Sequence, residues 1–219
     1  MIEVKNLTKS YLHHKGGRKY VFRDLSFTIP TDRNVAIIGR NGAGKSTLMN
    51  LLAKVDTPDR GEIITDKSIS WPVGLSGGFQ GSLSARENVK FIARTQGFRG
   101  DALREKVRFV EEFAEIEEYF DLPVKTYSSG MSGRVAFGLS LAFEFDYYLV
   151  DEAMSVGDAH FKKKASDAFK DKVGKANIIL VTHGMTQVRT MCDLVLVLHG
   201  GKATLYDDVE EGIKVYQNL

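Results

Sequence analysis

Compact runs of apolar residues recur along the chain, and each is short enough to form a single β-strand. Three runs composed mainly of Tyr, Val, Ile and Leu lie at 147–150, 177–181 and 194–198. Such runs are typical of strands covered on both faces, as in a parallel sheet. Alternating segments near the start predict antiparallel strands at 2–4, 20–22 and 25–29. We therefore expect an α/β fold, with a mainly parallel sheet and an N-terminal antiparallel β subdomain.

The middle of the chain has a different pattern. Between about residues 84 and 118, apolar residues such as Val89, Ile92, Val107 and Val110 recur at helical spacing among charged residues. We therefore expect a helical subdomain at about 81–140, inserted in the catalytic core. The chain has 219 residues, 43% of them hydrophobic, which suits one domain that spans residues 1–219.

A glycine-rich segment follows the apolar run 35–38 directly. Residues 39–47, called the phosphate loop below, fill every fixed position of the pattern G-x-x-x-x-G-K-[ST]. Its glycines let backbone N–H groups converge on phosphates, and a helix that begins near Lys45 adds the positive end of its dipole. Lys45 would reach the β- and γ-phosphates, and Ser46 would bind Mg²⁺. The predicted nucleotide-binding residues are Gly39, Asn41, Gly42, Ala43, Gly44, Lys45, Ser46 and Thr47.

Polar residues follow two of the predicted buried strands. Asp151 and Glu152 come directly after the strand 147–150, and the carboxyl ends of strands are where ligands bind in open α/β sheets. Asp151 would reach Mg²⁺ through its water shell, and Glu152 would polarise the water that attacks the γ-phosphate. His183 follows the strand 177–181 and could contact the γ-phosphate. A single histidine at a strand end is more often structural, so its assignment depends on the neighbouring motifs.

Composition excludes several function classes. Thirty Lys and Arg residues against 28 Asp and Glu leave a formal net charge of +2, so we expect no nucleic-acid partner. No apolar run approaches the roughly 18 residues that cross a bilayer, and the start of the chain lacks an export signal, so we expect a cytosolic protein. The single cysteine, Cys192, allows no internal disulfide and is expected to be buried and unreactive.

Together these segments resemble the nucleotide-binding subunit of an ATP-binding cassette (ABC) transporter, over essentially the whole chain. The L-S-G-G-Q segment of that family has two candidates here. Residues 75–79 match better by letter but come too soon after the phosphate loop. Residues 127–131, called the signature segment below, match less well but precede the acidic strand at the required distance. The resemblance implies that Ser128, Ser129 and Gly130 contact the γ-phosphate of ATP held by another subunit.

The resemblance also implies roles for three residues outside these segments. Gln80 is similar to the glutamine at the hinge between the catalytic core and the helical subdomain, where it would sense Mg²⁺ and the γ-phosphate. Asp158 lies where the family has its D-loop and would face the partner subunit. Tyr11 lies where an aromatic ring stacks on adenine, although packing against the core is a nearly equal alternative.

Further likenesses narrow the branch of the family. The segments 77–79, 86–88 and 153–158, and the Ser-Ser-Gly-Met form of the signature, resemble ATPases that export bacterial cell-surface polysaccharides. The nearest likeness is the capsular polysaccharide exporter. Exporters of O-antigen often carry a carbohydrate-binding domain after the cassette, and this sequence ends soon after its last core elements. Capsule export is therefore preferred, with O-antigen or teichoic acid export as the alternative.

The resemblance implies a Mg²⁺-dependent ATPase with a P-loop NTPase core, whose two copies pair head to tail around ATP. Because no membrane-spanning segment is visible, we expect a separate integral-membrane permease. The resemblance to polysaccharide exporters also implies further envelope export components. The chain itself would lie at the cytoplasmic face of the bacterial inner membrane as a peripheral subunit.

Two other functions stay open. A soluble ABC protein that acts on ribosomes or DNA usually carries two cassettes or a long coiled-coil insertion, and neither is visible. A phosphate-loop kinase or GTPase of small substrates would account for Lys45 and Asp151. It would leave the signature segment, Asp158 and His183 unexplained.

Overall fold

The computed structural model describes residues 1–13, 16–74, 78–151 and 158–219. The chain divides into two compact units, each described by itself below. The first unit comprises Met1–Pro72, Phe145–Glu152 and Lys175–Leu219. The second comprises Val73–Glu144 and Ala153–Gly174. The second unit thus contains the residues expected to form a helical subdomain, together with a later segment of the chain.

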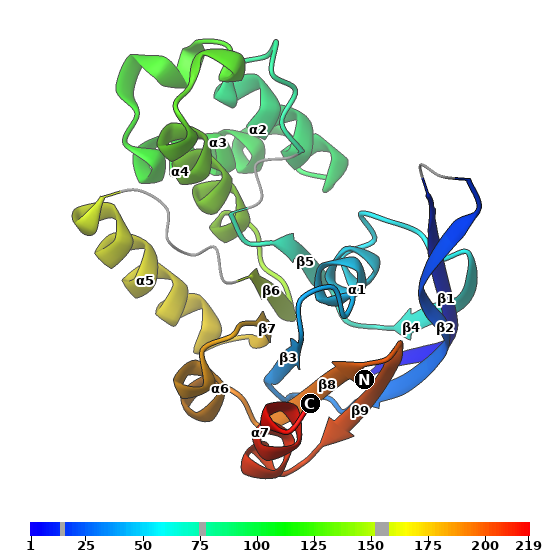
Figure 1. Ribbon diagram of the computed structural model, residues 1–219. Coiled ribbons are helices and arrows are strands. Elements are labelled where there is room, and N and C mark those ends of the chain that lie inside the picture. The colour runs from blue at the N-terminus through cyan, green and yellow to red at the C-terminus, as the bar shows by residue number, and fades with distance from the viewer. Residues whose placement is uncertain (14–15, 75–77, 152–157) are drawn as a thin grey trace. The chain divides into compact units, whose positions relative to one another are not determined.

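The first unit is built on a six-stranded sheet with the strand order β5-β6-β7-β3-β8-β9 (Figure 1). Its strands are β3 (Val35–Gly39), β5 (Ile69–Pro72), β6 (Tyr147–Asp151), β7 (Asn177–Val181), β8 (Leu194–His199) and β9 (Lys202–Tyr206). All neighbouring pairs are parallel except β8 and β9. The apolar runs predicted as strands are β6, β7 and β8, and they are almost entirely buried, because the sheet is covered on both faces.

A three-stranded antiparallel sheet of order β2-β1-β4 belongs to the same unit. Its strands are β1 (Ile2–Leu12), β2 (Arg18–Ile29) and β4 (Arg60–Thr65). The two strands predicted at 20–22 and 25–29 are one continuous strand, β2. The register between β1 and β2 shifts within this stretch, and Asp24 has a φ of 51°. Such an irregularity interrupts the alternation of apolar and polar residues without ending the strand.

One hydrophobic core joins the two sheets of the first unit. Leu48 and Leu51 of the short helix α1 (Lys45–Leu52) are buried in one hydrophobic cluster with residues of β3 and β6 and with Phe22 of β2. Two further helices of this unit, α6 (Met185–Met191) and α7 (Val209–Gln217), follow β7 and β9 along the chain. Because the phosphate loop lies between β3 and α1, the pairing of β3 in the sheet fixes one end of the loop and the packing of α1 fixes the other.

The second unit is helical, as the sequence predicts for its middle part. It contains α2 (Ala85–Thr95), α3 (Gly100–Ala114), α4 (Ser129–Leu141), α5 (Ala159–Val173) and two 3₁₀ turns, η2 (Glu117–Asp121) and η3 (Val124–Thr126). The ring of Phe113 on α3 stacks on Phe137 of α4 and meets the edge of Phe161 of α5, with centroids 6.0 and 5.6 Å apart. Gly138 makes room for this ring, because an added Cβ would lie 3.0 Å from Phe113 Cδ1.

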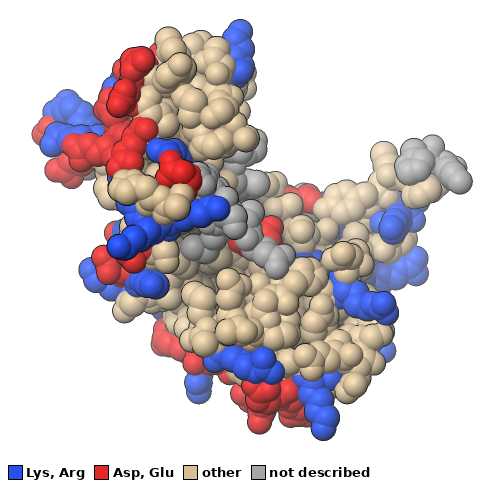
Figure 2. Space-filling view, turned by 60° about the vertical axis from the view of Figure 1, so that its left-hand side comes forward, with Lys and Arg blue, Asp and Glu red and all other residues tan. Residues whose placement is uncertain are grey.

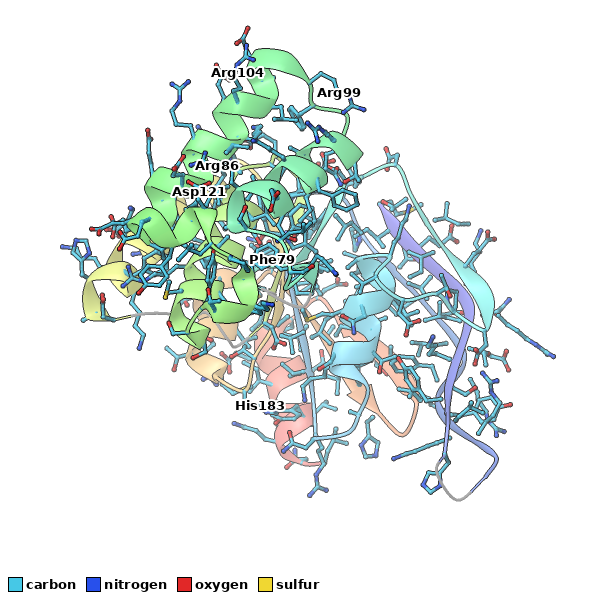
Figure 3. All side chains as sticks on the ribbon, turned by 90° about the horizontal axis from the view of Figure 1, so that it is seen from above. Phe79, Arg86, Arg99, Arg104, Asp121 and His183 are labelled. Carbon is cyan, nitrogen blue, oxygen red and sulfur yellow. The ribbon has the colours of Figure 1, made fainter. Side chains whose placement is uncertain are left out.

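Arg86 on α2 connects three segments of the second unit (Figure 3). Its guanidinium donates to Asp121 on η2 at 2.6 Å and to Glu111 on α3, and it lies over the ring of Phe120 at 5.1 Å. The two carboxylates raise the pKa of the guanidinium, and Arg86 in turn lowers the pKa of Asp121. This cluster holds η2 to the helices before it.

One face of the surface carries charges of both signs. On the face shown in Figure 2, basic and acidic side chains are interspersed and do not gather in one basic area. Among the described residues, no helix combines the length and the apolar character needed to cross a bilayer.

Candidate nucleotide site

The phosphate loop has the strand–turn–helix geometry that its sequence predicts. Gly42 and Gly44 have φ values of 80° and 100°, which residues with a Cβ rarely adopt. An added Cβ on Gly44 would also lie 2.6 Å from the ring of Phe22, and one on Gly39 would lie 2.5 Å from the carbonyl oxygen of Leu198. Glycine is therefore required here for both conformation and space.

Helix α1 begins at Lys45, and no side chain caps its N-terminus. The backbone N–H groups of a first helical turn have no partner within the helix, and together with the dipole they favour an anion. The Lys45 ammonium group donates to the carbonyl oxygens of Gly39 at 2.8 Å and Arg40 at 3.3 Å. Its positive charge is therefore held beside the loop, within reach of any phosphate that the loop accepts.

Most of the residues predicted to bind the nucleotide line one pocket of about 780 Å³ in the first unit. The predicted residues in its wall are Tyr11, Asn41, Gly42, Ala43, Gly44, Lys45, Ser46, Thr47, Asp151 and His183. Gly39 packs against the backbone of Leu198 and is not part of the wall. A volume of this size suits a nucleotide, since small-molecule pockets usually range from about 300 to 1,000 Å³.

The pocket has further wall residues that the sequence analysis did not assign to the site. They include Lys19, Tyr20 and Val21 of β2, and Gly200 and Gly201 between β8 and β9. The β2 residues could have been predicted to line the pocket, because the hairpin of β1 and β2 places Lys19 opposite Tyr11. Gly200 and Gly201 form the two-residue turn between the antiparallel strands β8 and β9, and two glycines between strands are a hairpin signal that could have drawn attention to them.

Tyr11 lies in the pocket wall and is not buried in the core, since 42% of the residue is exposed. Its hydroxyl donates to Asp56 Oδ2 at 2.8 Å, and the Lys9 ammonium group lies 5.0 Å from the ring centre. Partial burial and the bond to Asp56 raise the pKa of the Tyr11 phenol. The bond from Lys9 chiefly lowers the pKa of the Asp56 carboxyl. The phenol is thus neutral and fixed in direction, while its ring borders the pocket.

Asp151 and His183 come together because their strands pair in parallel. Asp151 lies opposite Val181 in the register of β6 and β7, and His183 follows Val181 by two residues. Asp151 and His183 both line the pocket. Buried Thr182 braces the turn that carries His183: its hydroxyl accepts from the Gly184 N–H at 2.9 Å and donates to Gln187 Oε1 at 2.8 Å. His183 Nδ1 lies 3.4 Å from the hydroxyl of Tyr216 on α7.

The pocket wall suits a Mg²⁺ ion that arrives with phosphates. Ser46 and Asp151 both line it and offer the oxygen ligands that this hard cation prefers. Within the described ranges, no group of three or more His, Cys, Asp or Glu side chains could hold a metal on its own. Phosphate oxygens and water would therefore have to complete the coordination.

Glu152, the predicted base, lies outside the described residues, as do residues 153–157 of the D-loop region. Residues 75–77 of the rejected signature candidate also lie outside them. These assignments stay predictions.

The signature segment lies at a helix start in the second unit. Ser128 is the N-cap of α4, its hydroxyl accepts from the Met131 N–H at 3.2 Å, and Ser129 is the first helical residue. Ser128 and Gly130 line a hollow of about 600 Å³ together with Arg134 and Asp158. The helix N-terminus predicted from residues 127–131 is therefore present.

The carboxylate of Asp158 contacts one residue of α5 and one of α4. It is the N-cap of α5 and accepts from the Phe161 N–H at 2.9 Å, while its other oxygen accepts from Arg134 Nη2 at 2.7 Å. The bond from Phe161 and the charge of Arg134 lower the pKa of the carboxyl. Sequence reasoning missed Arg134, which also lies 4.0 Å from Glu115. Only its place one turn after the signature segment could have drawn attention to it.

Gln80 is anchored in the second unit by Asn88. Its backbone N–H donates to Asn88 Oδ1 at 2.8 Å, and its carbonyl accepts from Asn88 Nδ2 at 3.2 Å. Asn88 is only 3% exposed, so this anchor is protected from water. The side-chain amide of Gln80 donates to Ser82 at 3.3 Å. The position of the Gln80 backbone is thus set by α2, whereas its predicted contact with Mg²⁺ stays a prediction.

Cys192 is buried, as expected, and burial raises the pKa of its thiol to about 12. A thiol in this state is a poor nucleophile.

The chain is similar to known proteins along nearly its whole length, and the similarity is not confined to the residues of the pocket. The polysialic acid transport ATP-binding protein KpsT of Escherichia coli is 52% identical over 223 residues, which cover 100% of this chain and 99% of KpsT. The capsule polysaccharide export ATP-binding protein CtrD of Neisseria meningitidis serogroup B is 42% identical over 219 residues and 100% of both chains. The O-antigen export system ATP-binding protein RfbB of Klebsiella pneumoniae is 35% identical over 203 residues, 92% of this chain and 82% of RfbB.

A solved structure of the ATP-binding cassette MJ0796, a dimer in a post-hydrolysis state with ADP and Pi, has the same fold. It matches with a TM-score of 0.73 at 23% identity, over 94% of this chain and 98% of that one. The predicted fold class is therefore confirmed. The family model described as ABC transporter matches residues 22–155, which include the phosphate loop, the signature segment and Asp151. With this match and 52% identity to KpsT along its full length, the chain belongs to the ABC transporter family.

Proposed function

We propose that this chain is the ATP-hydrolysing subunit of a transporter that exports a capsular polysaccharide across the bacterial inner membrane. The observation that carries the ATPase part is the single pocket lined by the phosphate loop, Tyr11, Asp151 and His183. The cargo is supported by relatives whose names concern capsule polysaccharide export and polysialic acid transport, and which are more similar than the O-antigen relative.

In this proposal each group around the pocket has one task toward ATP. The phosphate loop and Lys45 bind the phosphates, because N–H and ammonium donors neutralise charge that grows on the transferred group. Ser46 would bind Mg²⁺ through its hydroxyl and Asp151 would reach it through its water shell, and the ion would supply positive charge to the phosphate oxygens. Tyr11 stacks on the adenine, and Glu152 orients the attacking water. His183 donates to the γ-phosphate.

A second copy of the chain completes the site. The N-terminus of α4, with Ser128, Ser129 and Gly130, would close over the γ-phosphate bound by its partner, because the positive end of the helix dipole and the N–H groups of the first turn attract an anion. Asp158 would lie near the same seam, and Gln80 would sense Mg²⁺ and the γ-phosphate. Loss of the γ-phosphate removes these contacts, so hydrolysis reopens the dimer.

The ATPase would act with an integral-membrane permease at the cytoplasmic face of the inner membrane, together with further envelope components.

Deletion of the gene in its own host tests which polysaccharide is exported. We expect capsular polysaccharide to disappear from the cell surface and to accumulate inside. Loss of O-antigen or teichoic acid from the surface, with capsule intact, would replace capsule as the cargo.

The other two functions make different predictions for the purified protein. Membranes solubilised in mild detergent should yield this chain bound to a polytopic membrane protein. Recovery on ribosomes or DNA would favour a soluble ABC protein. Transfer of the γ-phosphate to a small acceptor, in place of release as inorganic phosphate, would favour a kinase.

A further inference from the structure

Helix α7 is fastened tightly to the sheet of the first unit. Asp208 caps its start by accepting from the N–H groups of Glu210 and Glu211 at 2.8 and 3.1 Å. Gly212 lies so close to β8 that an added Cβ would be 2.7 Å from the Cβ of Val195. Ile213 is 1% exposed. The helix therefore has one well-defined position on the sheet.

A bidentate ion pair joins α7 to α6, the helix that follows His183. Arg189 donates through Nε and Nη2 to the two carboxylate oxygens of Glu210, at 2.6 and 3.1 Å. Because α6 begins immediately after the turn of His183, this pair fixes the direction from which α7 approaches that turn.

The last turn of α7 and the residues after it then reach two parts of the nucleotide site. The hydroxyl of Tyr216 lies 3.4 Å from His183 Nδ1, and Figure 3 shows His183 beside the red helix α7. The carbonyl oxygen of Leu219 accepts from Arg40 Nη1 at 3.1 Å. Arg40 is the second residue of the phosphate loop. Helix α7 thus contacts the histidine of the pocket through Tyr216, and Leu219, two residues after the helix, contacts the phosphate loop.

The contact with Tyr216 has a consequence for the imidazole ring. A neutral imidazole carries one N–H, and the partner of one ring nitrogen decides which nitrogen carries it. A phenol that donates to Nδ1 leaves the proton on Nε2. The ring can then donate from Nε2, the nitrogen opposite the one that Tyr216 occupies.

We propose that Tyr216 is a positioning residue of the nucleotide site, whose hydroxyl holds His183 with Nδ1 as acceptor and Nε2–H as the donor toward the γ-phosphate. Helix α7 supplies the rigid support, and the bond from Arg40 to Leu219 keeps that support in register with the phosphate loop. The contact itself is independent of the proposed function, and only its use toward ATP depends on it.

The tautomer is tested without any nucleotide by ¹⁵N NMR of the full chain at about pH 8.5, above the usual imidazole range. The signals of His183 are assigned as those absent from His183→Ala. In the parental protein we expect an unprotonated Nδ1 and a protonated Nε2. In Tyr216→Phe, which keeps the ring and removes the hydroxyl, both ¹⁵N shifts should move toward a tautomer average. Unchanged shifts would overturn the proposal.

Tyr206→Phe is the matched control. Tyr206 lies on β9 beneath the same helix, and in the described part of the chain its hydroxyl has no hydrogen bond. Its replacement should leave the His183 signals where they are. A shift of equal size in this variant would mean that the packing of α7 is responsible and the hydroxyl of Tyr216 is not.

Kinetics test the use of the contact. Loss of one hydrogen bond that orients a donor should lower kcat for ATP by about twofold to tenfold, with little change in KM. In a His183→Ala background the same substitution should have no further effect. An equal loss in both backgrounds would overturn the positioning role. A parental chain that hydrolyses no ATP would contradict the proposed function instead, and the NMR result would still decide the contact.

Discussion

Arg134 of α4 and Asp158 at the start of α5 form an ion pair, with 2.7 Å between Nη2 and Oδ2. The pair connects the helix of the signature segment to the segment that follows Glu152 along the chain. Its carboxylate also caps α5, so both of its oxygens already have partners within one chain. Any contact of Asp158 with a second copy would have to share these bonds.

The lowered pKa of Asp158 gives this arrangement a pH dependence. Because the folded-state pKa lies below the unfolded value of about 3.9, the stabilisation is present above that value and is lost as pH falls through the folded pKa. Asp158→Ala should lower the melting temperature at pH 7. The difference from the parental protein should shrink as the pH falls below the unfolded value and through the folded pKa. A difference that persists in acid would assign the effect to another cause.

Arg86→Ala should destabilise the second unit by about 1–3 kcal/mol, because it leaves two carboxylates side by side without their shared donor. Arg104→Ala is the control, since Asp101 is the only ion-pair partner of Arg104 within the described ranges and both side chains are largely exposed. Such surface pairs contribute about 0–1 kcal/mol. Urea unfolding of both variants measures the difference, and equal losses would contradict the importance of the Arg86 cluster.

Removal of the Lys45 ammonium group should nearly abolish ATP hydrolysis. We expect Lys45→Ala to lose about 100-fold or more in turnover, the usual cost of one electrostatic donor at a transferring group. Lys54→Ala, at an exposed position just after α1, should keep the parental rate and affinity. Unchanged ATP affinity and turnover in Lys45→Ala would overturn the assignment of the phosphate loop.

Tyr11 offers a test of adenine stacking. Tyr11→Ala should raise the KM for ATP by about fivefold to 100-fold, since stacking of a base on an aromatic ring contributes about 1–3 kcal/mol. Tyr11→Phe loses the bond to Asp56 but keeps the ring, so its KM should stay near the parental value. If Phe were as harmful as Ala, the hydroxyl would matter and stacking would not explain the effect.

Glu152→Gln tests the proposed base. The amide keeps the shape of the side chain but cannot accept a proton, so ATP should bind and turnover should fall to a small fraction. Size-exclusion chromatography with ATP should then show a dimer that the parental protein, which hydrolyses its nucleotide, does not accumulate. Hydrolysis at the parental rate would remove Glu152 from that role.

Local patterns were sufficient for several parts of this protein. The phosphate loop is contiguous in sequence, and its glycines, its preceding strand and its following helix all lie within a few residues. Strands β6, β7 and β8 are apolar except at one end of each, because their central residues are buried on both faces of the sheet. The start of α4 was marked by Ser128, whose hydroxyl caps the helix within three residues.

Other parts depend on residues that are distant in sequence. Strands β5 and β9 have no long apolar run, and their pairing with β6 and β8 decides that they are strands. Contacts such as Tyr216 with His183 and Arg134 with Asp158 join helices and turns separated by whole elements. A pattern of neighbours specifies which face of a segment is buried. What that face meets is decided by strand order and helix packing, and only the folded chain contains that information.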